Sequence, residues 1–429
     1  MRSFAVRKKA RFNTMMRGSR GTTYDLEHLG LKMMKPALFA GCLIGSLPLT
    51  STTAAAHVKW FVNCNVSDNP LPVQAVFTTT FFVFFGLFLI LLYLGCVAER
   101  TVLGANVSQL LDHHTAELHR RADDLLRSVA AVSFALLWAD GGLIITPELK
   151  ASSIWLTAIQ LLIPIYMFGR ATLPAAGAGI IVLYGYGVAT YGLFHMLDYP
   201  VFLGLGVFFA LSASQNARLL AFRFDFLRWT VACSLLWPSI EKFVYPGWIA
   251  PIAITHPEIT LGFDVPTVVT AAGVVEFGLS FALFWTPMIR RLAALILVAV
   301  LTAATFDFGK VDGIGHLMII AILIVVFAHP GGTHDRRHPA LAPLAGSIAL
   351  PAVIFLYTGG HALYYGSKSA SVVPLASGAA LLTLILLCVP GRPQRLLRNA
   401  VSGMSRWSIR GGAGSEQRLR HTDIRPTVS

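Results

Sequence analysis

The chain has 429 residues, of which 55% are hydrophobic and 13% are charged, and its mean hydropathy is +0.65. Charged residues make up about 25% of a soluble globular domain, so this composition excludes a soluble enzyme. The net charge of +13 does not indicate a nucleic-acid partner, because the basic residues are scattered between apolar blocks. We therefore expect an all-α, polytopic membrane protein whose first partner is the lipid bilayer.

The N-terminal region has the pattern of a secretory signal peptide over residues 34–56. Met34-Lys35-Pro36 is followed by an apolar run from Ala37 to Leu49 and by small residues up to Ala56. Cleavage after Ala56 would leave residues 57–74 as a periplasmic segment, whereas an uncleaved first helix is the alternative. Residues 1–33 are basic and lack apolar periodicity, which indicates a cytosolic extension or a start codon placed too early.

Eleven apolar segments follow, each close to the length of about 20 residues that a helix needs to cross a bilayer. They are residues 75–97, 128–146, 152–169, 172–194, 201–215, 229–247, 265–286, 292–308, 315–329, 341–360 and 372–390. Small residues in the fourth segment, Ala175, Gly179, Gly185 and Ala189, favour close packing between helices.

The basic residues between these segments predict the orientation of the chain. From Arg100 onward, every arginine falls in connections that would lie on one side of the membrane, while the lysines at 59, 150, 242, 310 and 368 fall on the other. By the positive-inside rule the arginine side is cytoplasmic. This predicts a multi-pass protein of the bacterial inner membrane with a periplasmic mature N-terminus and a cytoplasmic C-terminus. Residues 98–127 have the spacing of an amphipathic cytosolic helix, and residues 391–429 resemble a disordered basic tail.

Ionisable residues inside apolar segments are costly and are therefore candidates for function. The candidates are Asp140, Glu241, Lys242, Glu276 and Asp307, of which Asp140 and Glu276 are expected to lie deep in the membrane. Glu241 and Lys242 are adjacent and do not share a helix face, so we expect them to pair with other helices rather than with each other. Structural ion pairs and a proton or cation relay both explain such residues.

Histidines give a second pattern, because the predicted topology places His57, His195, His316 and His361 on the outer side. Imidazoles are good ligands for copper or zinc, and an N-terminal His57 could chelate copper through its amine and ring. Asp312 and His316 share a face at i, i+4 spacing. Hydrogen-bonding histidines at the interface are the alternative, and no Cys-x-x-Cys-His motif indicates attached haem. No cofactor is assigned, although copper is considered.

The stretch Leu236 to Trp248, followed by Gly273-Val274-Val275-Glu276 and by Gly315-His316, resembles the DoxX-like family of small four-helix membrane proteins. The resemblance covers residues 228–327, within a region that we bound at 218–330. Its recurring residues map to Lys242, to Gly273 with Glu276, and to Arg290 or Arg291.

The resemblance implies an inner-membrane protein loosely associated with respiratory or other redox complexes. It leaves the helices of residues 75–217 without a counterpart, and residues 331–390 are expected to form two C-terminal membrane helices. A redox-associated or metal-handling membrane component is accordingly the expected function. A secondary transporter of a small solute or ion and a copper-dependent membrane oxidoreductase are the alternatives, and no catalytic residue is assigned.

Overall fold

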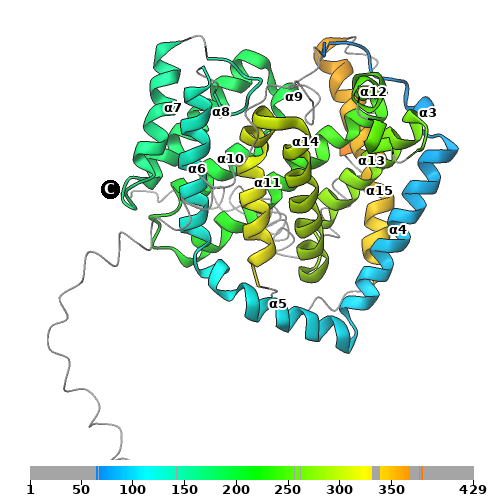
Figure 1. Cartoon of the computed structure of the whole chain (residues 1–429), viewed down its shortest axis with the longest axis horizontal. Coiled ribbons are helices and arrows are strands. Elements are labelled where there is room, and N and C mark those ends of the chain that lie inside the picture. Colours follow the sequence, from blue (N-terminus) through cyan, green and yellow to red (C-terminus); the bar gives the residue numbers. More distant parts are fainter. Residues whose placement is uncertain are drawn as a thin grey trace, which may run out of the picture.

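The computed structural model describes residues 64–366 apart from residues 66, 142–143, 152, 256, 261 and 331–338, together with residues 376, 378 and 379. The described chain folds into helices joined by short connections (Figure 1). They are α3 (Val73–Val76), α4 (Thr79–Glu99), α5 (Val102–Arg120), α6 (Ala122–Ala139), α7 (Ile154–Tyr166), α8 (Leu173–Tyr191), α9 (Leu193–Met196), α10 (Pro200–Ala210), α11 (Ala217–Val244), α12 (Pro246–Thr255), the 3-10 helix η1 (Pro257–Thr260), α13 (Val265–Ala282), α14 (Pro287–Ala328) and α15 (Leu341–Tyr365).

The all-helical prediction is confirmed, and five of these helices are long and apolar enough to cross a membrane. They are α4, α8, α13, α14 and α15. Two expected spans are shorter than predicted, because α7 has 13 residues and α10 has 11. At 1.5 Å per residue these helices reach only about 20 Å and 16 Å, against a hydrocarbon layer of about 30 Å. The proposed signal peptide and the segment 372–390 lie almost entirely outside the described residues.

Helix α14 is a hairpin of two arms rather than one rod. A straight helix of 42 residues would be about 63 Å long, yet Nε of Arg291 near its start donates a hydrogen bond of 3.0 Å to the carbonyl of His329 just beyond its end. The chain reverses at Gly309, which has a φ of 80° and a ψ of −158°. Glycine adopts this conformation readily, whereas residues with a side chain would be strained there. The two arms correspond to the separate segments 292–308 and 315–329 that the sequence predicts.

The hairpin lies at the centre of the bundle (Figure 1). It packs against α6, α13 and α4, while α11 contacts α10 and α13, and α8 joins α7 and α10. Helix α5 crosses below the other helices as a separate amphipathic helix, and it ends at Arg120 rather than continuing to residue 127. Its Thr115 hydroxyl lies 3.3 Å from the carbonyl oxygen of Ala328, so α5 is fixed to the end of the hairpin.

Charged side chains divide the bundle into two ends in the way that the sequence predicts. At one end, arginines join the connections: Arg170 contacts Asp124, Arg223 contacts Asp123, and Arg291 contacts Asp112. At the other end Lys310 contacts Asp140 at 2.9 Å. We call these the arginine end and the lysine end.

The closest helix packing involves glycines other than those expected. A Cβ atom at Gly177 of α8 would lie 2.4 Å from the backbone nitrogen of Ala210 and 2.5 Å from the carbonyl oxygen of Gly206, so α8 and α10 touch through their backbones. Gly179 packs against Ile163 as expected, whereas Gly185 has no neighbouring atom within 4 Å of its ideal Cβ position.

Candidate functional site

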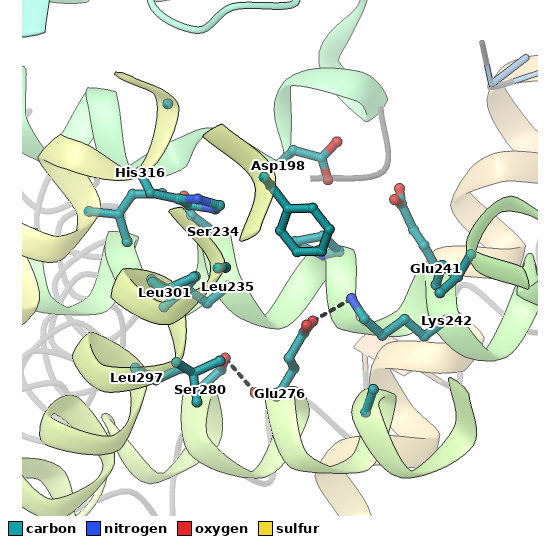
Figure 2. Close-up of a pocket in the computed structure, with 18 of the residues that line it drawn as sticks. Asp198, Ser234, Leu235, Glu241, Lys242, Glu276, Ser280, Leu297, Leu301 and His316 are labelled. Carbon is teal, nitrogen blue, oxygen red and sulfur yellow. Dashed lines mark hydrogen bonds and ion pairs between the residues drawn. The ribbon is translucent and has the colours of Figure 1, made fainter. Parts of the chain in front are cut away.

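A cavity of about 270 Å³ lies among α10, α11, α12, α13 and both arms of α14 (Figure 2). Most of its lining is apolar, but a few polar groups converge on it. They include Asp198, Tyr199, Ser234, Glu241, Lys242, Glu276, Ser280 and His316. A mostly apolar cavity with few polar groups is the usual form of a small-molecule site, so we take it as the candidate functional site.

An ion pair between Lys242 and Glu276 lies in the wall of this cavity. Lys242 Nζ on α11 is 2.6 Å from Glu276 Oε2 on α13, as the dashed line in Figure 2 marks. The ammonium group is largely buried, with a side-chain exposure of 14%, whereas Glu276 is 38% exposed and lines the cavity. This contact confirms the expectation that Lys242 pairs with another helix.

Gly273 explains how α11 and α13 bring the pair together. A Cβ atom at Gly273 would lie 2.7 Å from the ring of Phe243 and 3.2 Å from Cβ of Lys242. Gly273 and Glu276 share one helix face at i, i+3 spacing. The absence of a side chain at Gly273 therefore lets α11 approach so closely that Lys242 reaches the carboxylate one turn further along α13.

Glu241 turns away from Lys242, as the geometry of successive helix residues requires. Its carboxylate is buried and accepts a hydrogen bond of 3.1 Å from the hydroxyl of Tyr357 on α15. Glu241 therefore links the lining of the cavity on α11 to α15, which itself contributes no residue to that lining.

Two other predicted intramembrane charges lie elsewhere. Asp140 is not deep: α6 ends at Ala139, and the carboxylate pairs with Lys310 at the lysine end with a side-chain exposure of 32%. Hydropathy extended this segment too far, because the apolar residues Ile144 and Ile145 belong to the following buried connection rather than to the helix. Asp307 is exposed, two residues before the turn at Gly309.

The histidines considered as metal ligands contact carboxylates or aromatic rings of the protein. Nδ1 of His316 lies 3.0 Å from Oδ2 of the fully buried Asp312, which confirms the expected i, i+4 contact. His195 lies 3.0 Å from Glu148, whose carboxylate also accepts a hydrogen bond from the hydroxyl of Tyr199. His361 is buried among the rings of Phe194, Tyr245 and Tyr365.

Within the part of the chain that the structure describes, no three His, Cys, Asp or Glu side chains gather in a way that could hold a metal ion. His195, His316 and His361 therefore form no common metal centre with these residues. His57 lies outside the described residues, and the copper hypothesis at that residue stays a prediction.

Sequence reasoning did not find Glu148, Ser234 and Tyr357. Ser234 lines the cavity, Tyr357 donates a hydrogen bond to Glu241, and Glu148 contacts His195. Single tyrosines and serines in apolar segments are common, so no pattern marks these two residues. Glu148 was detectable in principle as a carboxylate in a short connection between two apolar segments.

Comparison with protein families, characterised proteins and solved structures finds no match to this chain. The DoxX-like resemblance therefore remains a hypothesis that depends on the short motifs around Lys242, Gly273 and Glu276.

At the arginine end, burial lowers the pKa of His329 to about 3, and the nearby Arg290 and His119 add to the shift. The ring of His329 stacks on Phe224 at 4.0 Å, just beyond the end of α14. In the unfolded chain His329 binds a proton near pH 6.5, whereas in the folded chain it stays neutral until the pH approaches 3. The free energy of unfolding should therefore decrease as the pH falls from about 6.5 toward 3.

We expect the slope from this residue to stay below about 1.4 kcal/mol per pH unit. Thermal melts of the purified protein between pH 7.5 and 4.5 measure it. His329→Gln should flatten the curve, while His113→Gln, on the exposed face of α5, should not. Equal slopes for the parent and His329→Gln would contradict the assignment.

Proposed function

We propose that this chain is a redox-associated component of a membrane, of DoxX-like type, whose cavity binds a small organic molecule and exchanges a proton with it. The observation that carries the proposal is the Lys242–Glu276 ion pair in the wall of a mostly apolar cavity. Three of the residues that the resemblance singles out, Lys242, Gly273 and Glu276, form one contact there, which supports the same assignment.

The chemistry follows from the low polarity of the surroundings. Charges interact strongly in an apolar site, so a ligand that accepts a hydrogen bond from Lys242 competes with Glu276 for the ammonium group, and the carboxylate beside it is placed to exchange a proton with the ligand. A quinone-type molecule fits both features, since its ring suits the apolar lining and its carbonyl oxygens accept hydrogen bonds. The electrons would come from a respiratory or other redox partner, and the chain would supply binding and protons.

Binding of decylubiquinone to the full-length protein in detergent tests this proposal. We expect saturable binding that Lys242→Met weakens about tenfold, which corresponds to 1.4 kcal/mol. Lys310→Met is the matched control, because Lys310 carries the same charge at the lysine end and does not line the cavity. The proposal fails if the parent shows no saturable binding, or if both variants bind like the parent.

A secondary transporter is the second candidate, and the hairpin favours it. The first arm of α14 lines the cavity through Leu297 and Leu301, and the second arm through His316 and Ile319. Relative movement of the two arms about Gly309 would change access to the cavity. Solute-driven alkalinisation or acidification inside vesicles loaded with a pH indicator, without any redox partner, would favour this candidate over the first.

We further propose the finer topology: a bacterial inner-membrane location, a cleaved signal peptide ending at Ala56, eleven spans and a cytoplasmic C-terminus. The alternation of arginine and lysine connections supports it. A phosphatase reporter fused after Ser429 should be inactive, whereas the same reporter inserted after His256 should be active. An active fusion at Ser429 would exclude an odd number of spans after a periplasmic N-terminus.

A further inference from the structure

One side of the cavity is half-exposed, and it is formed by α13 and the first arm of α14. Val300 of that arm lines the cavity and is 50% exposed, more than any other lining residue. Glu276 of α13 points into the cavity (Figure 2), and its side chain is 38% exposed. We call the part of the lining formed by Glu276 and Val300 the lateral side of the cavity.

Buried residues close the cavity toward both ends of the bundle. Helix α12 lies at the lysine end (Figure 1), and its Ile252 and Ala253 line the cavity and are buried. Toward the arginine end, the lining residues Ser280 and Leu297 are buried as well. The lateral side is therefore the part of the lining that is open to the outside of the bundle.

The two residues of the lateral side lie at the same depth, near the middle of their helices. Glu276 lies about 16 Å along α13 from its start at Val265, which is at the lysine end. Val300 lies about 14 Å before the turn at Gly309, which is at the same end. Both helices are long and apolar enough to span a membrane, and a hydrocarbon layer is about 30 Å thick. The lateral side therefore faces the middle of this layer rather than water.

The surroundings of the lateral side are apolar and low in bulk. Val275 beside Glu276 is 53% exposed, and Ile296, one turn before Val300, is 38% exposed. Ala272 lies one turn from Glu276 and Ala304 one turn from Val300, and both alanines line the cavity. Alanine at both positions leaves more room between the two helices than a branched apolar residue would.

The size of the cavity indicates how much of a ligand it encloses. Its volume of about 270 Å³ is just below the range of about 300–1,000 Å³ for sites that enclose a drug-sized ligand. A substituted ring fits such a space, whereas a long alkyl or isoprenoid tail on the same molecule would extend beyond it.

We propose that the cavity opens sideways into the bilayer at Glu276 and Val300, and that its ligand is a lipid-soluble molecule whose apolar tail passes through this opening. The inference rests on the quinone-type ligand proposed above, and it adds the tail and the route of entry. The ring lies in the cavity beside Lys242, and the tail stays in the hydrocarbon layer along Val275 and Ile296.

Equilibrium binding of two probes to the full-length protein in detergent tests the proposal. They are decylubiquinone and 2,3-dimethoxy-5-methyl-1,4-benzoquinone, which is the same ring without the tail. Val300→Trp places a large side chain in the opening. We expect it to weaken binding of decylubiquinone about tenfold or more and binding of the tail-less ring less than about twofold. Leu292→Trp is the control, because Leu292 is 54% exposed on the same arm and does not line the cavity, so this variant should bind both probes like the parent.

The outcomes separate this inference from the proposed function. If Val300→Trp binds decylubiquinone like the parent, weakens both probes equally, or matches Leu292→Trp, the lateral opening is wrong. Binding by the parent that depends on Lys242 would still support the proposed function. If the parent binds neither probe, the proposed function and the lateral opening both fail.

A photoaffinity experiment on the parent keeps the test decisive if Val300→Trp does not fold. An analogue of decylubiquinone with a diazirine in the middle of its tail is photolysed with the full-length protein, and mass spectrometry identifies the labelled peptides. We expect labelling of α13 and the first arm of α14 around Val275 and Ile296, which an excess of decylubiquinone suppresses. Suppressible labelling confined to α12 or α10 would show that the tail leaves by another route, and the absence of suppressible labelling would also overturn the proposal.

Discussion

Glu276→Leu is expected to destabilise the protein by about 3 kcal/mol, because it leaves the Lys242 ammonium group buried without its carboxylate. Glu276→Gln should cost less than half as much, since the amide oxygen still accepts a hydrogen bond from Lys242. Melting temperatures of the detergent-solubilised variants measure both effects.

The double variant Lys242→Met with Glu276→Leu separates the role of the pair from that of the cavity. It removes both charges and fills similar volumes with apolar groups, so it should recover most of the stability lost in Glu276→Leu. Ligand binding should stay impaired, because both members of the ion pair in the cavity wall are gone. If Glu276→Leu melts like the parent, the pair stabilises neither the contact between α11 and α13 nor the cavity.

Gly177→Ala is expected to cause the second large effect, a loss of about 3 kcal/mol or of folded expression. The added methyl group would meet the backbones of Ala210 and Gly206 at 2.4 Å and 2.5 Å, and neither atom can move without separating α8 from α10. The yield of monodisperse protein and its melting temperature test this expectation.

Gly185→Ala on the same helix is the control. Because no atom lies within 4 Å of its ideal Cβ position, the substitution should be neutral or slightly stabilising through the better helix propensity of alanine. If both variants lost the same amount of stability, α8 would be sensitive to any substitution. The loss in Gly177→Ala would then not indicate a specific backbone contact at Gly177.

The sequence predicted the helical class, the separation of arginines and lysines and the contact of Asp312 with His316, because each depends on local spacing or on composition. It also predicted that Glu241 and Lys242 face different helices, which follows from the 100° rotation between successive residues. Which helices they meet depends on how α11 packs against α13 and α15, and one sequence does not contain that information.

The wrong predictions also concern how the helices pack, which one sequence does not contain. Asp140 was placed deep because hydropathy does not distinguish a helix from a buried connection. Gly185 was expected to pack closely together with Ala175, Gly179 and Ala189, because every small residue suits close packing equally. The arginines at the start of α14 entered the sequence analysis through the topology and, for Arg290 or Arg291, through the DoxX-like resemblance.

The reversal at Gly309 has a consequence for biosynthesis. The connection between the arms of α14 carries Asp307, Lys310 and Asp312, which are costly to move through hydrocarbon one helix at a time. The first arm emerges from the ribosome with Asp307 near its end, before the strongly apolar residues 317–328 have been made. We therefore expect the two arms to enter the bilayer together as a preformed helical pair. Truncation of the chain, or a pause of the ribosome, between residues 309 and 317 should then leave the first arm incompletely inserted.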